Sequence, residues 1–162
     1  MIYDTQSAFS GAIAADGTRS GQAITATAIS TNVIDTRAGS KAGGPTLADL
    51  GTTGLLVYLI VQVGQAFNTL TSLTITLESD STANLATSAT LHASLGAIPL
   101  ASLTAGAVLA RIPLPVGATY ERYLGMRYTV TGANPTQGTV FAFLAFEPGL
   151  NVAYPGGFTV DA

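Results

Sequence analysis

Several residue types are absent or scarce in this sequence of 162 residues, and each scarcity excludes a class of protein. There is no cysteine, so the chain has neither a disulfide framework nor thiolate chemistry. Charged residues make up only 9%, against about 25% in a typical soluble protein. Because the Glu, Lys and Arg that solvate helix faces are scarce, a long helical bundle is not expected. With six basic residues and a net charge of −3, the chain lacks the positive surface that nucleic-acid binding requires.

Long hydrophobic runs are also missing. The longest one, residues 55–61, is far shorter than the roughly 20 residues that a membrane-spanning helix needs. The first residues show no basic stretch followed by an apolar one, so no signal peptide is expected. We therefore expect a soluble chain that is made in the cytoplasm.

What the sequence does contain is 48% hydrophobic residues, few of them aromatic, together with many Gly, Thr and Ser residues. This hydrophobicity argues against intrinsic disorder, which requires low hydrophobicity and high net charge. A chain of this length makes one domain and buries roughly 70% of its unfolded surface without a metal ion or disulfide. A surface solvated by hydroxyl groups and backbone rather than by charges favours a β protein.

Short stretches with the pattern of strands recur between turn residues. Four of them alternate between apolar and polar side chains, which is typical of half-buried strands. These alternating stretches are residues 24–28, 73–77, 89–95 and 124–130. In residues 89–95 the alternation places Leu91 on the apolar face and His92 on the polar face.

Two further stretches, residues 55–63 and 140–146, are apolar on both faces. This pattern indicates strands that are covered on both sides, by a second layer or by a partner. With residues 107–112 and a short piece near Phe158, the chain has about eight strands, which predicts an all-β, jelly-roll-like sandwich. One helical turn fits at residues 99–105.

The same patterns divide the chain into three parts. Residues 1–22 show no sustained period and are expected to form an irregular N-terminal arm. Residues 23–147 are expected to form the β-sandwich domain, and residues 148–162 a C-terminal tail or last strand.

Residues able to carry chemistry are few. His92 is the only histidine, and a general base needs an orienting partner that is not near it in the sequence. Glu78 and Asp80 are close together, but a solvated turn is a simpler interpretation than a glycosidase pair or a calcium site. No nucleophile elbow, phosphate-binding loop or His-Glu motif occurs. We therefore expect a protein that is not an enzyme, with no catalytic residue, cofactor or metal ion.

Arginine and tyrosine residues gather in one third of the chain, between residues 111 and 128. One interpretation is that each arginine solvates a strand end or face, and that Glu121 pairs with Arg111 or Arg122. The other is that Arg and Tyr anchor a protein interface, where both are enriched. The residues expected to contact a partner are Tyr3, Phe9, Arg111, Arg122, Tyr123, Arg127, Phe141, Phe143 and Phe158.

Several short motifs follow one another in an order that resembles a known family. They are MIYD at 1–4, FS at 9–10, QAITATAISTNVID at 22–35, IPL at 98–100, LP at 114–115, RYLGMRY at 122–128, Gly138 and FAFL at 141–144. This order is similar to that of the capsid cement proteins of tailed bacteriophages, typified by the Bordetella phage cement protein. The resemblance covers most of residues 1–147 and leaves the segment from residue 148 onward unmatched.

The resemblance implies a jelly-roll decoration protein in the virion, on the exterior of the capsid, made in the cytoplasm of a host bacterium. Such a protein bridges subunits of the phage major capsid protein and stabilises the shell against the pressure of its DNA. It has no active site and binds neither nucleic acid nor a membrane. Because closed symmetry is the rule for homo-oligomers, we expect this chain to associate with itself, with a dimer favoured over a trimer.

One alternative from another class stays open, a carbohydrate-binding β-sandwich module of a phage or bacterial adhesin. That function predicts an exposed platform of aromatic side chains. The absence of tryptophan, with six each of Tyr and Phe, supports it poorly.

Overall fold

The computed structural model describes residues 7–36, 57–86, 88–115 and 118–146 of the chain. Within these residues it contains strands and one short 3-10 helix, η2 (Leu100–Ser102). The strands are β1 (Ala8–Ser10), β2 (Ala12–Ile13), β3 (Arg19–Ser20), β4 (Gln22–Ala23), β5 (Ala28–Ile29), β6 (Ile34–Asp35), β7 (Val57–Gln65), β8 (Leu70–Asp80), β9 (Thr90–Pro99), β10 (Val108–Pro113), β11 (Tyr123–Gly132) and β12 (Thr139–Phe146).

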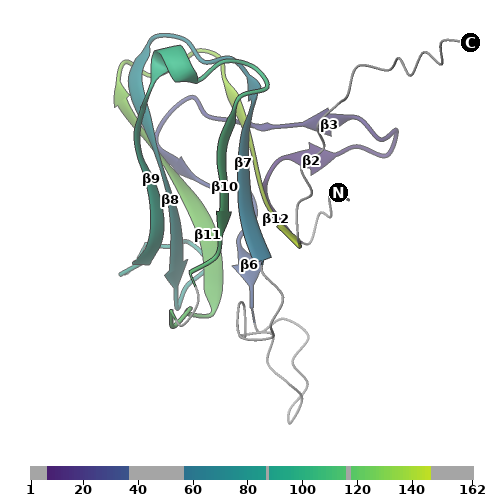
Figure 1. Ribbon diagram of the computed structural model, residues 1–162, viewed down its shortest axis with the longest axis vertical. Coiled ribbons are helices and arrows are strands. Elements are labelled where there is room, and N and C mark those ends of the chain that lie inside the picture. The colour runs from purple at the N-terminus through teal and green to yellow at the C-terminus, as the bar shows by residue number, and fades with distance from the viewer. Residues whose placement is uncertain (1–6, 37–56, 87, 116–117, 147–162) are drawn as a thin grey trace, which may run out of the picture.

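Most of these strands form two antiparallel sheets. The first has the order β1–β12–β7–β10, with β4 also pairing with β12. The second has the order β5–β11–β8–β9, with β6 also pairing with β11. Figure 1 shows the two sheets as facing layers, with β7, β10 and β12 in one and β8, β9 and β11 in the other. The prediction of an all-β sandwich is confirmed.

The order in which the strands pair is nested. The strand β4 pairs with β12, β5 with β11, β7 with β10 and β8 with β9. Early strands therefore pair with late ones, and the innermost pair is adjacent in the sequence. This nested pairing builds the two antiparallel sheets, which enclose one main core between them.

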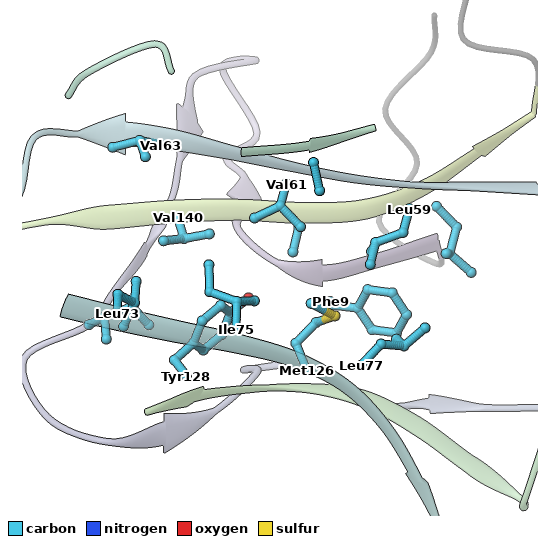
Figure 2. Packing of buried hydrophobic residues seen from close by; sticks show 14 of the residues in the cluster. Phe9, Leu59, Val61, Val63, Leu73, Ile75, Leu77, Met126, Tyr128 and Val140 are labelled. Atoms are coloured by element: carbon cyan, nitrogen blue, oxygen red, sulfur yellow. The ribbon is translucent and has the colours of Figure 1, made fainter. Parts of the chain in front are cut away.

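The core lies between the sheets and follows from the alternation in the sequence. Leu73, Ile75 and Leu77 point inward from β8, because alternate side chains of a strand lie on the same face. Figure 2 shows these side chains facing those that β7 contributes from the other sheet, with Met126 and Tyr128 beside them. The sequence predicted this inward face of β8 and of β11 correctly.

The strands β7 and β12 are apolar on both faces, as predicted. Their inward side chains, such as Val61 and Ala142, belong to the main core. Their outward side chains form a second, smaller cluster on the outside of the sheet, in which Ile60 and Phe143 are buried together with Ala8 of β1.

The N-terminal segment, residues 1–22, differs from the irregular arm that was expected. Where it is described, it contributes β1 and the start of β4, and both pair with β12: Ser10 opposite Ala142 and Gln22 opposite Val140. Between them the chain leaves the sheet as the β2–β3 hairpin, which projects from the sandwich in Figure 1. The partner strand lies more than a hundred residues away in the sequence, so no local period reveals this pairing.

The strand β9 contains a second departure from the expected pattern. Leu77 pairs with Ala93 but Glu78 pairs with Leu91, so His92 is an extra residue in a β-bulge. The bulge reverses the alternation, and Leu91, which was predicted to lie inside, is 58% exposed. The prediction for Leu91 was therefore wrong.

The 3-10 helix η2 lies where the sequence has room for one helical turn. The helix η2 lies within residues 99–105 and joins the regions of β9 and β10. No helix among the described residues combines the length and hydrophobicity needed to cross a bilayer.

Candidate interaction surface

The residues predicted to contact a partner do not gather at one site. Tyr3 and Phe158 lie outside the described residues. Phe9 was predicted as a contact but is fully buried, with its ring in the core between the sheets (Figure 2). A side chain in that position cannot reach a partner, because β1 completes the sheet and carries Phe9 inward. The prediction for Phe9 was wrong.

The outward residues of β7, β10 and β12 form a surface that we call the apolar face. It consists of Tyr58, Ile60 and Gln62 of β7, Val108, Arg111 and Pro113 of β10, and Phe141, Phe143 and Ala145 of β12. The strand register places these residues side by side, with Arg111 opposite Ile60 and Phe143 opposite Ile60 on the other side. Arg111 is the one charged residue of this set.

Exposure changes across the apolar face. Phe143, predicted as a partner contact, is only 6% exposed and belongs to the buried outer cluster, so it does not offer a contact surface. Phe141 packs against that cluster and is half-buried. Toward the β10 edge the face opens, and Val108 is 53% exposed beside the exposed Arg111. The accessible part of the face is therefore its β10 side.

The outer face of the other sheet has different chemistry, and we call it the hydroxyl face. It consists of Ser72, Thr74 and Thr76 of β8 and Thr129 and Thr131 of β11, which the register places opposite one another. These residues alternate with buried ones such as Leu73 and Tyr128, so their hydroxyl groups point outward. At one end, Leu91 of β9 lies on the same face, opposite Glu78.

That end of the hydroxyl face carries an ion pair. Arg127 Nε donates to Glu78 Oε2 at 2.8 Å, and its Nη2 donates to the carbonyl of Leu85 at 2.5 Å. Thr76 Oγ1 donates to the other carboxylate oxygen at 2.7 Å. Arg127 thus fixes the loop after β8, whose Leu85 side chain is buried over Gly125. Arg127 was predicted to contact a partner; in the structure its guanidinium joins Glu78 of β8 to the Leu85 carbonyl within the chain.

The same contacts correct the interpretation of the two neighbouring carboxylates. Glu78 and Asp80 were expected in a solvated turn, but they are 9% and 2% exposed. The strand β8 continues to Asp80, and Asp80 Oδ1 accepts hydrogen bonds from Ser81 and Thr82 at 3.2 Å. Among the described residues, no three His, Cys, Asp or Glu side chains lie close enough together to hold a metal ion.

Arg122 and Tyr123 lie at the same end of the sandwich, where β6 meets β11. Arg122 forms an ion pair with Asp35, with Nη2 and Oδ2 2.9 Å apart, and its guanidinium lies 4.9 Å from the centre of the Tyr123 ring. Both residues are accessible, so they stay candidates for a contact. The pairing of Glu121 with an arginine was wrong in this structure, because Glu121 accepts from Thr90 Oγ1 at 2.9 Å.

His92 was predicted to lie on the polar face of a strand, but in the structure its ring contacts Ser79 and Tyr120. Its Nε2 lies 2.6 Å from Ser79 Oγ, and its ring centre lies 4.3 Å from that of Tyr120. Burial lowers the pKa of His92, and the negative charge of Glu121 partly opposes this shift. No pattern in the sequence indicates these contacts, because they depend on the bulge in β9 and on a segment nearly thirty residues away.

Comparison with known proteins places this architecture in a family. The chain matches no curated protein. Its residues 18–144 match the sequence profile of the family described as Bbp16. The matched region is more than half of the chain and includes every strand of both sheets from β4 to β11 and most of β12. The chain therefore belongs to the Bbp16 family, a family of Bordetella phage proteins.

Proposed function

We propose that the protein is a capsid cement protein, which binds the outside of a phage head and bridges neighbouring subunits of the major capsid protein. Membership of a phage protein family supports a role in the phage particle. The observation that carries the structural role is the contrast between the two outer faces of the sandwich, one apolar and one lined by hydroxyl groups.

Such a contrast suits a protein that lies between a protein lattice and water. Burying apolar surface stabilises an interface by about 25 cal/mol per Å² removed from water, so the apolar face gains most from contact. The hydroxyl groups of the hydroxyl face can hydrogen-bond to water, and burying them in an interface would remove those bonds. A protein present in many copies on a lattice needs only modest individual contacts, because multivalent attachment multiplies them.

The proposed role involves no catalysis. Among the described residues, Ser79 and His92 are the one serine and histidine in hydrogen-bond contact, and Ser79 is fully buried. A nucleophile must reach its substrate, and this hydroxyl group has no access to one. The proposal likewise includes no bound cofactor, nucleic acid or membrane.

The alternative function, carbohydrate binding by an adhesin module, needs exposed aromatic rings. Every Tyr and Phe whose side chain is described is buried or half-buried. The two large hydrophobic residues that are strongly exposed are aliphatic, Leu91 and Val108. These features support the cement function over the alternative.

Two matched variants test the proposal. Val108→Glu places a charge on the accessible part of the apolar face, and Thr131→Glu places the same charge on the hydroxyl face, on the opposite side of the sandwich. Both positions are exposed, and Thr131 lies opposite the uncharged Ser72, so neither variant is expected to disturb folding. Binding is measured by co-sedimentation with empty capsid shells assembled from the major capsid protein of the same phage, and circular dichroism checks the fold.

We expect the wild type and Thr131→Glu to sediment with the shells, and Val108→Glu to bind at least about tenfold more weakly, because a buried unpaired charge costs several kcal/mol. If the wild type does not sediment with the shells but binds glycans, the result would favour the adhesin function instead. Equal binding by both variants would contradict the use of the apolar face.

We also propose that the protein forms a homo-oligomer, most simply a dimer, since closed cyclic symmetry is usual and capsids offer twofold positions. Light scattering across a dilution series measures the mass directly. A monomer at every concentration would contradict this part of the proposal. A variant lacking residues 1–10 is unsuitable as a probe, because it removes β1 and the buried Phe9.

A further inference from the structure

One polar cluster ties three segments of the chain together at the end of the core. Ser79 of β8 contributes a fully buried hydroxyl group, and His92 of β9 lies 2.6 Å from it through Nε2. From the segment before β11, the backbone N–H of Glu121 donates to the same hydroxyl oxygen at 3.0 Å. The β-bulge at residue 92 is what turns the imidazole toward Ser79, since a regular strand would point it the other way.

The hydrogen-bond chemistry of the cluster favours one placement of its protons. A backbone N–H can only donate, so Ser79 Oγ is the acceptor of the bond from Glu121. The hydroxyl group has one proton to donate, and His92 Nε2 is the acceptor in reach. In this placement the imidazole carries its own proton on Nδ1 and is neutral, because a protonated ring has no nitrogen left to accept.

We propose that His92 is a proton-sensitive latch: the neutral imidazole, acting through Ser79, holds residues 118–122 against β8 and β9, and its protonation releases them. This inference does not rest on the proposed capsid function. When Nε2 gains a proton, the buried Ser79 hydroxyl loses its acceptor, and an unsatisfied buried polar group is costly. The Ser79 hydroxyl proton and the new Nε2 proton then face each other, and moving the histidine or the segment that contains Glu121 relieves this conflict.

The charged groups around the ring are few. Glu121 approaches from the segment before β11, and its carboxylate accepts a hydrogen bond from Thr90. Tyr120 of the same segment packs on the ring and donates its hydroxyl proton to the carbonyl of Pro115 at 3.0 Å. On β8, Glu78 and Asp80 flank Ser79 in the strand and so point to the opposite face.

Two further points concern the charge near the cluster. Arg122 is engaged in an ion pair with Asp35. On β9 the neighbours of His92 are the uncharged Leu91 and Ala93. Glu121 is thus the one charged group among the described neighbours that favours the protonated ring, and burial opposes it. The latch is therefore expected to open only in mild acid.

Because His92 is the only histidine, nuclear magnetic resonance can observe the latch without ambiguity. Long-range ¹H–¹⁵N spectra distinguish the two neutral tautomers and the protonated ring across a pH titration. We expect the Nδ1–H tautomer at pH 8 and a titration midpoint below the usual value of about 6.5. As the ring protonates, the amide protection factor of Glu121 is expected to fall roughly threefold to tenfold, the effect of losing one hydrogen bond.

Two serine variants separate the latch from a general effect of mutation. Ser79→Ala removes the hydroxyl group, so the Nδ1–H preference should disappear and the Glu121 amide should lose protection already at pH 8. Ser94→Ala removes an exposed hydroxyl group from β9, the strand of His92; this hydroxyl group accepts from the backbone N–H of Gly96, and its loss should change neither readout.

The titration of the wild type alone decides the inference if Ser79→Ala does not fold. An Nε2–H tautomer at pH 8, a midpoint at or above 6.5, or a Glu121 protection factor that does not follow the titration of His92 would each overturn it.

Discussion

At the scale of single residues, two ion pairs of similar geometry differ in their surroundings. Arg127 and Glu78 have side chains that are 31% and 11% exposed, and Arg127 also holds the Leu85 carbonyl. Arg122 and Asp35 are 47% and 23% exposed. Removing one partner of a pair costs more where the remaining charge is buried, because water cannot replace the lost contact.

We therefore expect Arg127→Ala to lower the free energy of unfolding by about 1–3 kcal/mol, mainly because Glu78 is left without its cation. Arg122→Ala is the matched control and should cause a clearly smaller loss, since exposed ion pairs contribute little. Urea denaturation followed by circular dichroism measures both. Equal losses in the two variants would show that Arg127 has no special structural task.

Gly138 illustrates how one position can combine conformational and steric demands. Its φ is +135°, and a Cβ atom added there would overlap the ring of Phe67. Gly106 also has a positive φ, +82°, but open space where a Cβ atom would lie. The two glycines therefore separate the cost of the backbone conformation from the cost of the collision.

We expect Gly106→Ala to lose about 1–2 kcal/mol of stability from backbone strain alone. Gly138→Ala should lose a further 1–3 kcal/mol or so, because Phe67 or the backbone must move. Thermal and urea unfolding of both variants test the difference. If the losses are the same, the packing of Phe67 against Gly138 is not the constraint that we infer.

The latch at His92 also predicts how stability depends on pH. Burial lowers the pKa of His92 in the folded state below its unfolded value of about 6.5. The unfolded chain then binds the proton more readily, so this contribution to stability is complete above pH 6.5 and is lost as the pH falls through the folded pKa. We expect the unfolding midpoint of the wild type to fall more steeply between pH 7.5 and 5 than that of His92→Gln. Parallel curves would contradict this prediction.

At the scale of elements, the β2–β3 hairpin is an insertion between β1 and β4, which would otherwise form one continuous edge strand beside β12. Ser10 pairs opposite Ala142 and Gln22 opposite Val140, so a single residue between Ser10 and Gln22 would lie opposite Phe141. The register therefore has room for a direct connection. Two-stranded hairpins contribute little stability by themselves, and β2 and β3 contain two residues each.

We expect a variant without residues 12–21, in which Gly11 alone joins Ser10 to Gln22, to keep the sandwich. Its free energy of unfolding should fall by about 1–2 kcal/mol, because the deletion removes Ile13, which packs against the outer cluster of Ile60 and Phe143, whereas shortening the loop changes the closure entropy only slightly. Circular dichroism and urea denaturation measure the outcome. Loss of the folded state would mean that the hairpin is part of the sandwich rather than an excursion from it.

The elements also show which parts of the fold could be predicted from the sequence. Local alternation located β8 and β11 and their inward residues, and apolar runs on both faces located β7 and β12. The strand β1 and the burial of Phe9 depend on pairing with β12, and the exposure of Leu91 depends on a bulge. Neither effect has a local period. The contacts of His92 were missed for the same reason, since their register is set by the partner strands.

At the scale of the whole molecule, the account rests on a sandwich with unlike outer faces in a chain with few charges. The hydroxyl face and low charge keep the molecule hydrated without strong long-range electrostatic attraction or repulsion. The accessible β10 side of the apolar face, where Val108 is exposed, is the surface that would gain from burial against other subunits. Because its interactions are mainly apolar, we expect shell binding to weaken little between 50 mM and 500 mM salt. A loss of binding in high salt during co-sedimentation would indicate electrostatic attachment instead.

The most direct test of the central claim is a cryo-electron microscopy reconstruction of the mature phage head. The account predicts density for the two-layered sandwich on the outer surface of the shell, in contact with more than one major capsid subunit, with the β10 side of the apolar face against the shell and the hydroxyl face toward solvent. Heads assembled without this protein should lack that density and regain it when the protein is added. A shell whose outer surface shows no such density, in virions that contain the protein, would contradict the account.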